Sequence, residues 1–172
     1  MTTVPHDPAQ AAERPRTLSA FIIERAAVEQ EPGVVFRHYT LLCSHCRNNR
    51  FTLLQRRRNS IGAIGDAIVG LSLRCSHCGT NKSVFDARTD GYDGVLGHNE
   101  ILAGASREEP LAGPNGTELS AVRVRATLSF NGADYLAIAK EEGTPAVDLF
   151  DWFEMFALLN DEWTSVWDYE CA

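Results

Sequence analysis

The chain contains 172 residues, of which 44% are hydrophobic and 23% are charged. This length suffices for one domain with its own hydrophobic core, and the composition is typical of a soluble globular protein and unlike that of a disordered chain. The apolar run Ala20–Ile23 is too short for a signal-peptide core, and no later run approaches the roughly 18 residues of a membrane span. We therefore expect a soluble cytoplasmic protein that does not bind membranes.

Charge is distributed unevenly along the chain. The formal net charge is −7; residues 1–90 carry 12 basic and 8 acidic side chains, whereas residues 91–172 carry 4 and 15. A strongly negative second half disfavours nonspecific attraction to phosphate backbones. It favours either solubility alone or binding of a basic protein.

The first part of the chain predicts a tail, a helix and several strands. Residues 1–16 contain three prolines and little apolar content, which predicts a disordered tail. Thr17–Gln30 has a possible N-cap and apolar residues at helical spacing, which favours a helix, although Phe21–Ile23 fits a short strand equally well. Strands are predicted at Val34–Leu42 and Phe51–Leu54, and Leu71–Arg74 and Ser83–Ala87 lead into and out of the second cysteine pair described below.

The second part of the chain begins with turn signals, because Asp90–Gly94 contains two Asp-Gly pairs. Beyond it, turn residues, alternating apolar residues and capping signals define the remaining elements. These are a loop or hinge at residues 104–116, a strand at residues 122–130, a helix at Ala133–Glu142, a second helix holding Leu149, Phe150, Phe153 and Phe156, and a final strand at Trp163–Glu170.

Two Cys-x-x-Cys motifs, Cys43/Cys46 and Cys75/Cys78, are the strongest chemical signal in the sequence. Their surroundings match as well, because each reads Cys-Ser-His-Cys and is followed by an asparagine and a basic residue. Two such turns supply the four soft thiolates that a tetrahedral zinc ion prefers. Four thiolates leave no open position on the metal, so the sequence predicts a structural zinc ion and not a catalytic one.

With these four cysteines, residues 34–90 resemble a zinc ribbon, a broad class in which two knuckles face each other across a small antiparallel sheet. The resemblance implies that Cys43, Cys46, Cys75 and Cys78 are the zinc ligands, and it implies no reaction. Two features depart from the common pattern. The motifs are 28 residues apart instead of roughly 15–20, and Arg47 follows the first knuckle where Gly79 follows the second.

Other roles for these side chains are weaker hypotheses. A Cys-x-x-Cys motif can act as a redox dithiol, but two near-identical motifs are what a four-thiolate site requires. His45 and His77 could replace a thiolate, although solvent-facing positions on the turns are the simpler interpretation. Cys171 is the odd thiol next to the C-terminus, and we expect it to be a spectator.

Two alternative functions have candidate residues. The nearby group Asp90, Asp93, His98 and Glu100 could supply a general acid and base, which would make the protein an enzyme. A basic group around and beyond the first knuckle could contact nucleic acid through phosphate groups. That group comprises Arg47, Arg50, Arg56, Arg57 and Arg58.

Taken together, the patterns predict an α+β protein with an antiparallel zinc-ribbon-like sheet in residues 17–105. A C-terminal strand-helix-helix-strand unit in residues 106–172 would pack on it to form one compact domain. The function that we favour is a non-enzymatic, zinc-binding protein-interaction module. An adaptor, or an inhibitor or immunity-type protein that binds a basic partner, would fit the acidic second half. The sequence does not determine the oligomeric state.

Overall fold

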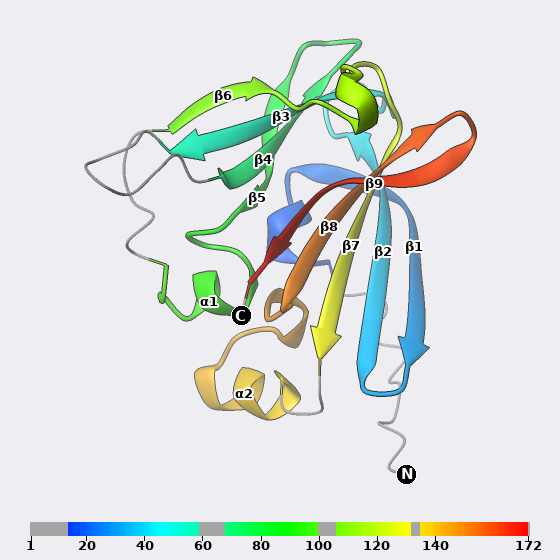
Figure 1. Cartoon of the computed structure of the whole chain (residues 1–172). Coiled ribbons are helices and arrows are strands. Elements are labelled where there is room, and N and C mark those ends of the chain that lie inside the picture. Colours follow the sequence, from blue (N-terminus) through cyan, green and yellow to red (C-terminus); the bar gives the residue numbers. More distant parts are fainter. Residues whose placement is uncertain (1–13, 59–67, 100–105, 132–134, 172) are drawn as a thin grey trace.

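The computed structural model describes residues 14–58, 68–99, 106–131 and 135–171. Within those ranges, nine strands form two antiparallel sheets (Figure 1). The first sheet has, in spatial order, β1 (Phe21–Glu31), β2 (Val34–Cys43), β7 (Val124–Asn131), β8 (Trp152–Leu159) and β9 (Glu162–Glu170). The second sheet has, in spatial order, β5 (Asn81–Asp86), β4 (Ile68–Cys75), β3 (Phe51–Arg58) and β6 (Ser106–Pro110).

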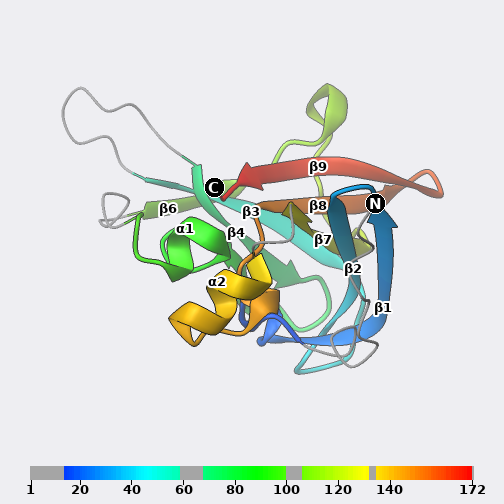
Figure 2. The ribbon, with the colours of Figure 1, turned by 90° about the horizontal axis from the view of Figure 1, so that it is seen from below.

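Helices are few and short in the described residues. They are α1 (Gly91–Val95) and α2 (Tyr135–Glu142), with single turns of 3-10 helix at η2 (Arg16–Leu18), η4 (Pro114–Gly116) and η5 (Ala146–Asp148). Figures 1 and 2 show α1 and α2 near each other at one end of the molecule, where both contact η5. No helix in the described part of the chain is long and apolar enough to cross a membrane. The fold is therefore mainly antiparallel β, within the broad α+β class.

The two sheets meet at a corner next to the first cysteine motif. Strand β2 ends in the first sheet at Cys43, and the chain re-enters in the second sheet at Phe51. There Phe51 exchanges both backbone hydrogen bonds with Val122, at 2.8 and 3.0 Å, just before β7 returns to the first sheet. Each sheet thus combines strands from the first and second halves of the sequence.

An aromatic cluster fills the space between the sheets. The ring of Phe85, on β5 of the second sheet, lies 4.9 Å from the ring of Phe153 on β8 and 5.5 Å from that of Trp167 on β9, measured between centroids. Tyr169 and Phe150 complete the cluster, with ring distances to Phe85 of 5.1 and 6.3 Å. Since each aromatic side chain buries about 150–250 Å², this cluster is a major source of cohesion between the sheets.

The helix predicted for Thr17–Gln30 is wrong. Only η2 is helical, and β1 then pairs with β2 over its whole length, from Phe21 opposite Cys43 to Glu31 opposite Val34. Two of the four apolar residues that suggested a helix, Phe21 and Ile22, are aromatic or β-branched, and such residues favour a pleated, half-buried surface. Pairing with β2 therefore prevails over a weak helical spacing.

The second helix predicted near residues 149–156 is also wrong. After η5 the chain forms β8, whose burial alternates: Phe153, Met155 and Ala157 are buried while the residues between them are partly exposed. This period of two belongs to a strand. From residue 124 onward the chain therefore forms β7, α2, β8 and β9. Of these, β7, α2 and β9 lie where the sequence predicts a strand, a helix and a strand.

Three smaller differences concern loops and the tail. Ser106–Pro110, in the predicted loop at 104–116, is strand β6, and the Asp-Gly turn region forms α1. Residues 1–13 of the predicted tail lie outside the described residues, as does the glycine-rich stretch 61–65. The end of the predicted tail is described, and there the Arg16 amide donates a 2.7 Å hydrogen bond to the buried Asp148 carboxylate.

We expect Phe85→Ala to lower the free energy of unfolding by about 3–5 kcal/mol, because it removes the ring that joins the two sheets and leaves a cavity. Phe36→Ala is the matched control, since Phe36 is only half-buried and stacks on His38 at 6.5 Å. Denaturant unfolding of both variants gives the comparison. Equal losses would show that Phe85 has no special role.

Candidate metal centre

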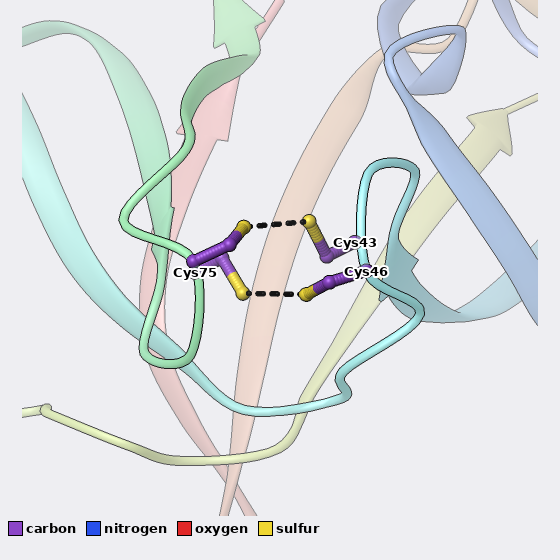
Figure 3. Close-up of side chains that lie close together, drawn as sticks. Cys43, Cys46 and Cys75 are labelled. Carbon is purple, nitrogen blue, oxygen red and sulfur yellow. Dashed lines mark hydrogen bonds between the residues drawn. The ribbon is translucent and has the colours of Figure 1, made fainter.

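The structure brings the four cysteines of the two motifs together. Their sulfur atoms all lie within 4.8 Å of one another. The Cys43 and Cys78 sulfurs are 3.6 Å apart, and the Cys46 and Cys75 sulfurs 3.5 Å apart (Figure 3). A tetrahedral zinc ion with Zn–S bonds of about 2.3 Å holds its sulfurs about 3.8 Å from one another. The cluster therefore has the size and donor set of a four-thiolate metal site.

The two turns have the same backbone geometry. In the first, the Arg47 amide donates to the Cys43 carbonyl at 2.8 Å. In the second, the Gly79 amide donates to the Cys75 carbonyl at 2.9 Å. The residue after each second cysteine has a left-handed conformation, with φ of 62° at Arg47 and 70° at Gly79. The matching sequences thus form matching turns, even though the first lacks the glycine.

The site joins strands from both sheets. Cys43 ends β2 of the first sheet, whereas Cys75 ends β4 of the second, opposite Phe51 in the β3–β4 ladder. The Ser76 amide also donates a 3.0 Å hydrogen bond to the Arg50 carbonyl, which links one turn to the chain leaving the other. A metal ion here would bind the place where the chain crosses between the sheets.

Hydrogen bonds within the turns shift the thiol pKa values. The hydrogen bond with the Thr80 side chain, whose oxygen lies 3.2 Å from the Cys78 sulfur, acts with the Thr80 amide to lower the pKa of Cys78 to about 6. Burial raises the pKa of Cys75, but backbone amides of the second turn outweigh burial and lower the pKa overall. At Cys46 the Asn48 amide lowers the pKa, but burial and the other three thiols raise it overall to about 12. Without a cation, the cluster therefore keeps a proton on Cys46 that a bound metal would displace.

Asn48 and Thr80 are the supporting residues that the sequence interpretation missed. The Asn48 side-chain amide lies 3.6 Å from the Cys75 sulfur, and Thr80 contacts the Cys78 sulfur. Both occupy the second position after the last cysteine of their motif. The alignment of the two motifs was the signal that could have identified them.

The two histidines of the cysteine motifs and the fifth cysteine do not belong to the four-sulfur cluster. His45 and His77 are exposed on the turns. Cys171 is buried against Gly91, and that burial raises the pKa of its thiol. Among the described residues, no second group of three or more His, Cys, Asp or Glu side chains has the spacing to hold a metal ion.

The predicted basic group does not form one patch. Arg47 and Arg50 lie beside the first knuckle, and Arg56 follows Arg50 by six positions of extended chain, about 20 Å. Arg56 forms a 3.3 Å ion pair with Asp86 and donates a 2.7 Å hydrogen bond to a backbone carbonyl of β5.

The other two arginines of the run face β6. Arg57 is paired with Glu109, and Arg58 lies opposite Ser106 in the β3–β6 ladder. With Arg56 bound to β5, two of the three arginines already have carboxylate partners within the second sheet.

The predicted acid and base residues have different surroundings, and only two of those that the structure describes contact each other. Asp90 is largely enclosed and accepts hydrogen bonds from the Asp86 amide at 2.7 Å and the Thr17 hydroxyl at 2.9 Å. Burial raises the pKa of its carboxyl. Asp93 and His98 form a 3.0 Å pair that is partly exposed, and Glu100 lies outside the described residues. The Asp90 carboxylate thus stabilises the turn before α1 by accepting these hydrogen bonds.

We expect Arg47→Gly to raise the free energy of unfolding by about 1 kcal/mol, because glycine adopts the left-handed conformation without a steric penalty. Gly79→Ala should lower it by a similar amount. A Cβ at Gly79 would have no atom within 4 Å, so its cost is that of the backbone alone. Denaturant unfolding of the metal-loaded variants measures both values. A loss of stability in Arg47→Gly would mean that the Arg47 side chain makes a contribution larger than the strain.

Comparison with known proteins finds no match: no protein-family model, no curated protein and no solved structure matches the chain.

Proposed function

We propose that the protein is a non-enzymatic binding module, stabilised by one structural zinc ion, that recognises a basic protein. The zinc part is supported by one observation above all: four cysteine sulfurs from two matching turns converge within 4.8 Å. Zinc accepts four thiolates in a closed tetrahedron, and no ligand position is left for a substrate. The two knuckles and the ion between them then connect the two sheets in a ribbon-like arrangement.

The acidic edge of the first sheet supports the binding part of the proposal. Strand β9 is the last strand of that sheet, and no strand pairs with its outer edge among the described residues. Glu162, Asp168 and Glu170 on this strand are exposed, and Asp161 in the preceding turn is exposed as well. An unpaired strand edge can add a strand from a partner, and acidic side chains along it would select a basic one. We refer to β9 and Asp161 as the acidic edge.

The acidic edge serves an adaptor and an inhibitor or immunity-type protein equally well. Either would hold an extended basic segment of its partner through backbone hydrogen bonds and charge attraction. Two other acidic residues of the second half are less available. Asp148 is buried against the Arg16 amide, and Asp151 accepts a backbone hydrogen bond from Asn131.

Nucleic-acid binding by the arginine run is the second candidate, and the ion pairs of Arg56 and Arg57 count against it. An arginine already paired with a carboxylate must give up that partner to contact a phosphate. Charge reversal of these arginines would also leave Asp86 and Glu109 facing new acidic side chains. The third hypothesis is enzymatic activity through Asp90, Asp93, His98 and Glu100, and the geometry of the described residues adds no support to it.

We expect purified protein to contain about one zinc ion per chain. Cys75→Ser should lose most of the zinc, because it removes one of the four ligands. His77→Ala is the matched control, since His77 is exposed on the same turn and should leave the zinc content unchanged. Elemental analysis after gel filtration measures the content. A folded wild-type protein without metal, or full zinc content in Cys75→Ser, would contradict the metal assignment.

We expect a ten-residue peptide of alternating lysine and valine to shift the backbone amide signals of β9 in NMR spectra of the whole protein. The reason is that such a peptide matches a basic strand added to an acidic edge. A peptide with glutamate in place of lysine should not bind. Asp168→Lys/Glu170→Lys should weaken the interaction strongly, whereas Glu141→Lys/Glu142→Lys, which changes the same amount of exposed charge on α2, should have a smaller effect.

Two results would refute the acidic edge as a docking site. One is an equal loss of peptide binding in both double variants, since the attraction would then depend only on net charge. The other is tight, salt-sensitive binding of a duplex DNA by the wild-type protein, which would favour the nucleic-acid alternative.

A further inference from the structure

A second candidate site lies on the outer face of the first sheet, away from the cysteine cluster. It is a half-open pocket of about 380 Å³ formed by β1, β2, β7 and the β8–β9 hairpin. Its volume lies at the small end of the range for ligand pockets. The polar and aromatic lining is Arg25, Glu29, His38, Arg123, Arg125 and Trp163.

The strand register explains why this face is hollow. Thr40 on β2 lies opposite Arg25 on β1 and also opposite Arg125 on β7, so the three residues form one row across neighbouring strands. Strands are about 4.8 Å apart, which puts the Cα atoms of the two arginines about 10 Å apart with a short side chain between them. In the next row, Ala27 is small but lies opposite His38. Thr40 and Ala27 are therefore the short side chains of the pocket, and longer side chains lie around them.

Arg125 is fixed in position but has no acidic partner. Its guanidinium lies 4.8 Å from the ring centroid of Phe156 and 5.1 Å from that of Trp163, so both rings hold it by cation–π contacts. Among the described residues it forms no ion pair, and its buried Nε atom has no hydrogen-bond partner. The Arg125 guanidinium is therefore fixed by two rings and has no carboxylate partner among the described residues, so it can bind an anion.

Three arginines and one glutamate line the pocket, so the lining itself carries more positive than negative charge. Arg25 is exposed and has no ion pair within the described part of the chain. Arg123 pairs at 3.5 Å with Glu24, and Glu29 pairs at 3.5 Å with His38. Burial lowers the pKa of His38, which favours its uncharged form, and the arginines are the permanent positive charges of the pocket.

We propose that this pocket binds a small organic phosphate, with the phosphate between Arg25 and Arg125 and the organic group against Trp163. A phosphate monoester carries nearly two negative charges at neutral pH, which matches the two arginines that lack acidic partners. Guanidinium groups bind phosphate oxygens in pairs, and the planar indole offers a stacking surface. Glu154, Asp161 and Glu162 on the same hairpin disfavour a long polyanion and leave a small ligand as the better fit.

Isothermal titration calorimetry of the full chain at low ionic strength tests this proposal with adenosine 5′-monophosphate, inorganic phosphate and adenosine as probes. The monophosphate should bind more tightly than inorganic phosphate, and adenosine should not bind. Arg25→Gln and Arg125→Gln should each weaken monophosphate binding by about tenfold or more, as expected for loss of a charged hydrogen-bonding partner. Lys140→Gln removes one exposed positive charge on α2 and should leave the affinity unchanged.

The Arg125→Gln variant loses cation–π contacts and could unfold for that reason. Arg25 is exposed, so Arg25→Gln should fold normally and still tests the proposal. The proposal is overturned if none of the probes binds at millimolar concentration, or if Lys140→Gln weakens binding as much as Arg25→Gln. Tighter binding of a single-stranded oligonucleotide than of the monophosphate would also overturn it, since the face would then be a polyanion surface.

Discussion

Four thiol groups held within 4.8 Å of one another are the constraint on which the rest of this structure depends. The chain leaves the first sheet at Cys43 and enters the second at Phe51, and the cysteine cluster connects that crossing to the β4–β5 turn. Four thiolates at this separation repel each other strongly unless a cation lies among them. A divalent ion reduces the charge to −2 and replaces repulsion by four bonds. The aromatic cluster around Phe85 then fills the space that the crossing creates.

The opposite charges of the two halves of the chain are partly used inside the fold. Arg57 pairs with Glu109 and Arg123 pairs with Glu24, so basic and acidic residues from different halves meet across strands. Partly exposed pairs of this kind each contribute at most about 1 kcal/mol to stability. Their larger consequence is that these arginines, which the sequence alone suggests are free to bind a ligand, already have carboxylate partners. The acidic edge of β9 and the pocket at Arg125 carry charge that is not compensated in this way.

The sequence predicted the cysteine site better than it predicted the fold. Spacing and similarity of the two motifs were enough to identify Cys43, Cys46, Cys75 and Cys78 as one cluster, because a four-thiolate site needs two such turns. The β1–β2 hairpin was missed although Pro32-Gly33 is a turn signal, and Gly33 has a φ of 83° there. The apolar residues of β8 were assigned to a helix because Thr144-Pro145 has the pattern of a helix cap followed by a first-turn proline. The pocket was not predictable, since it depends on strand order, which brings Arg25 and Arg125 to one row.

We propose that a zinc ion, bound only by cysteine sulfur, holds the crossing between the two sheets. X-ray absorption spectroscopy at the zinc edge of the purified protein tests it most directly, because this method reports the atoms bound to the metal. Four sulfur neighbours at about 2.3 Å are the predicted result. Nitrogen or oxygen neighbours at about 2.0–2.1 Å in place of one or more sulfurs would contradict the claim, since they would mean an incomplete thiolate shell or a different site.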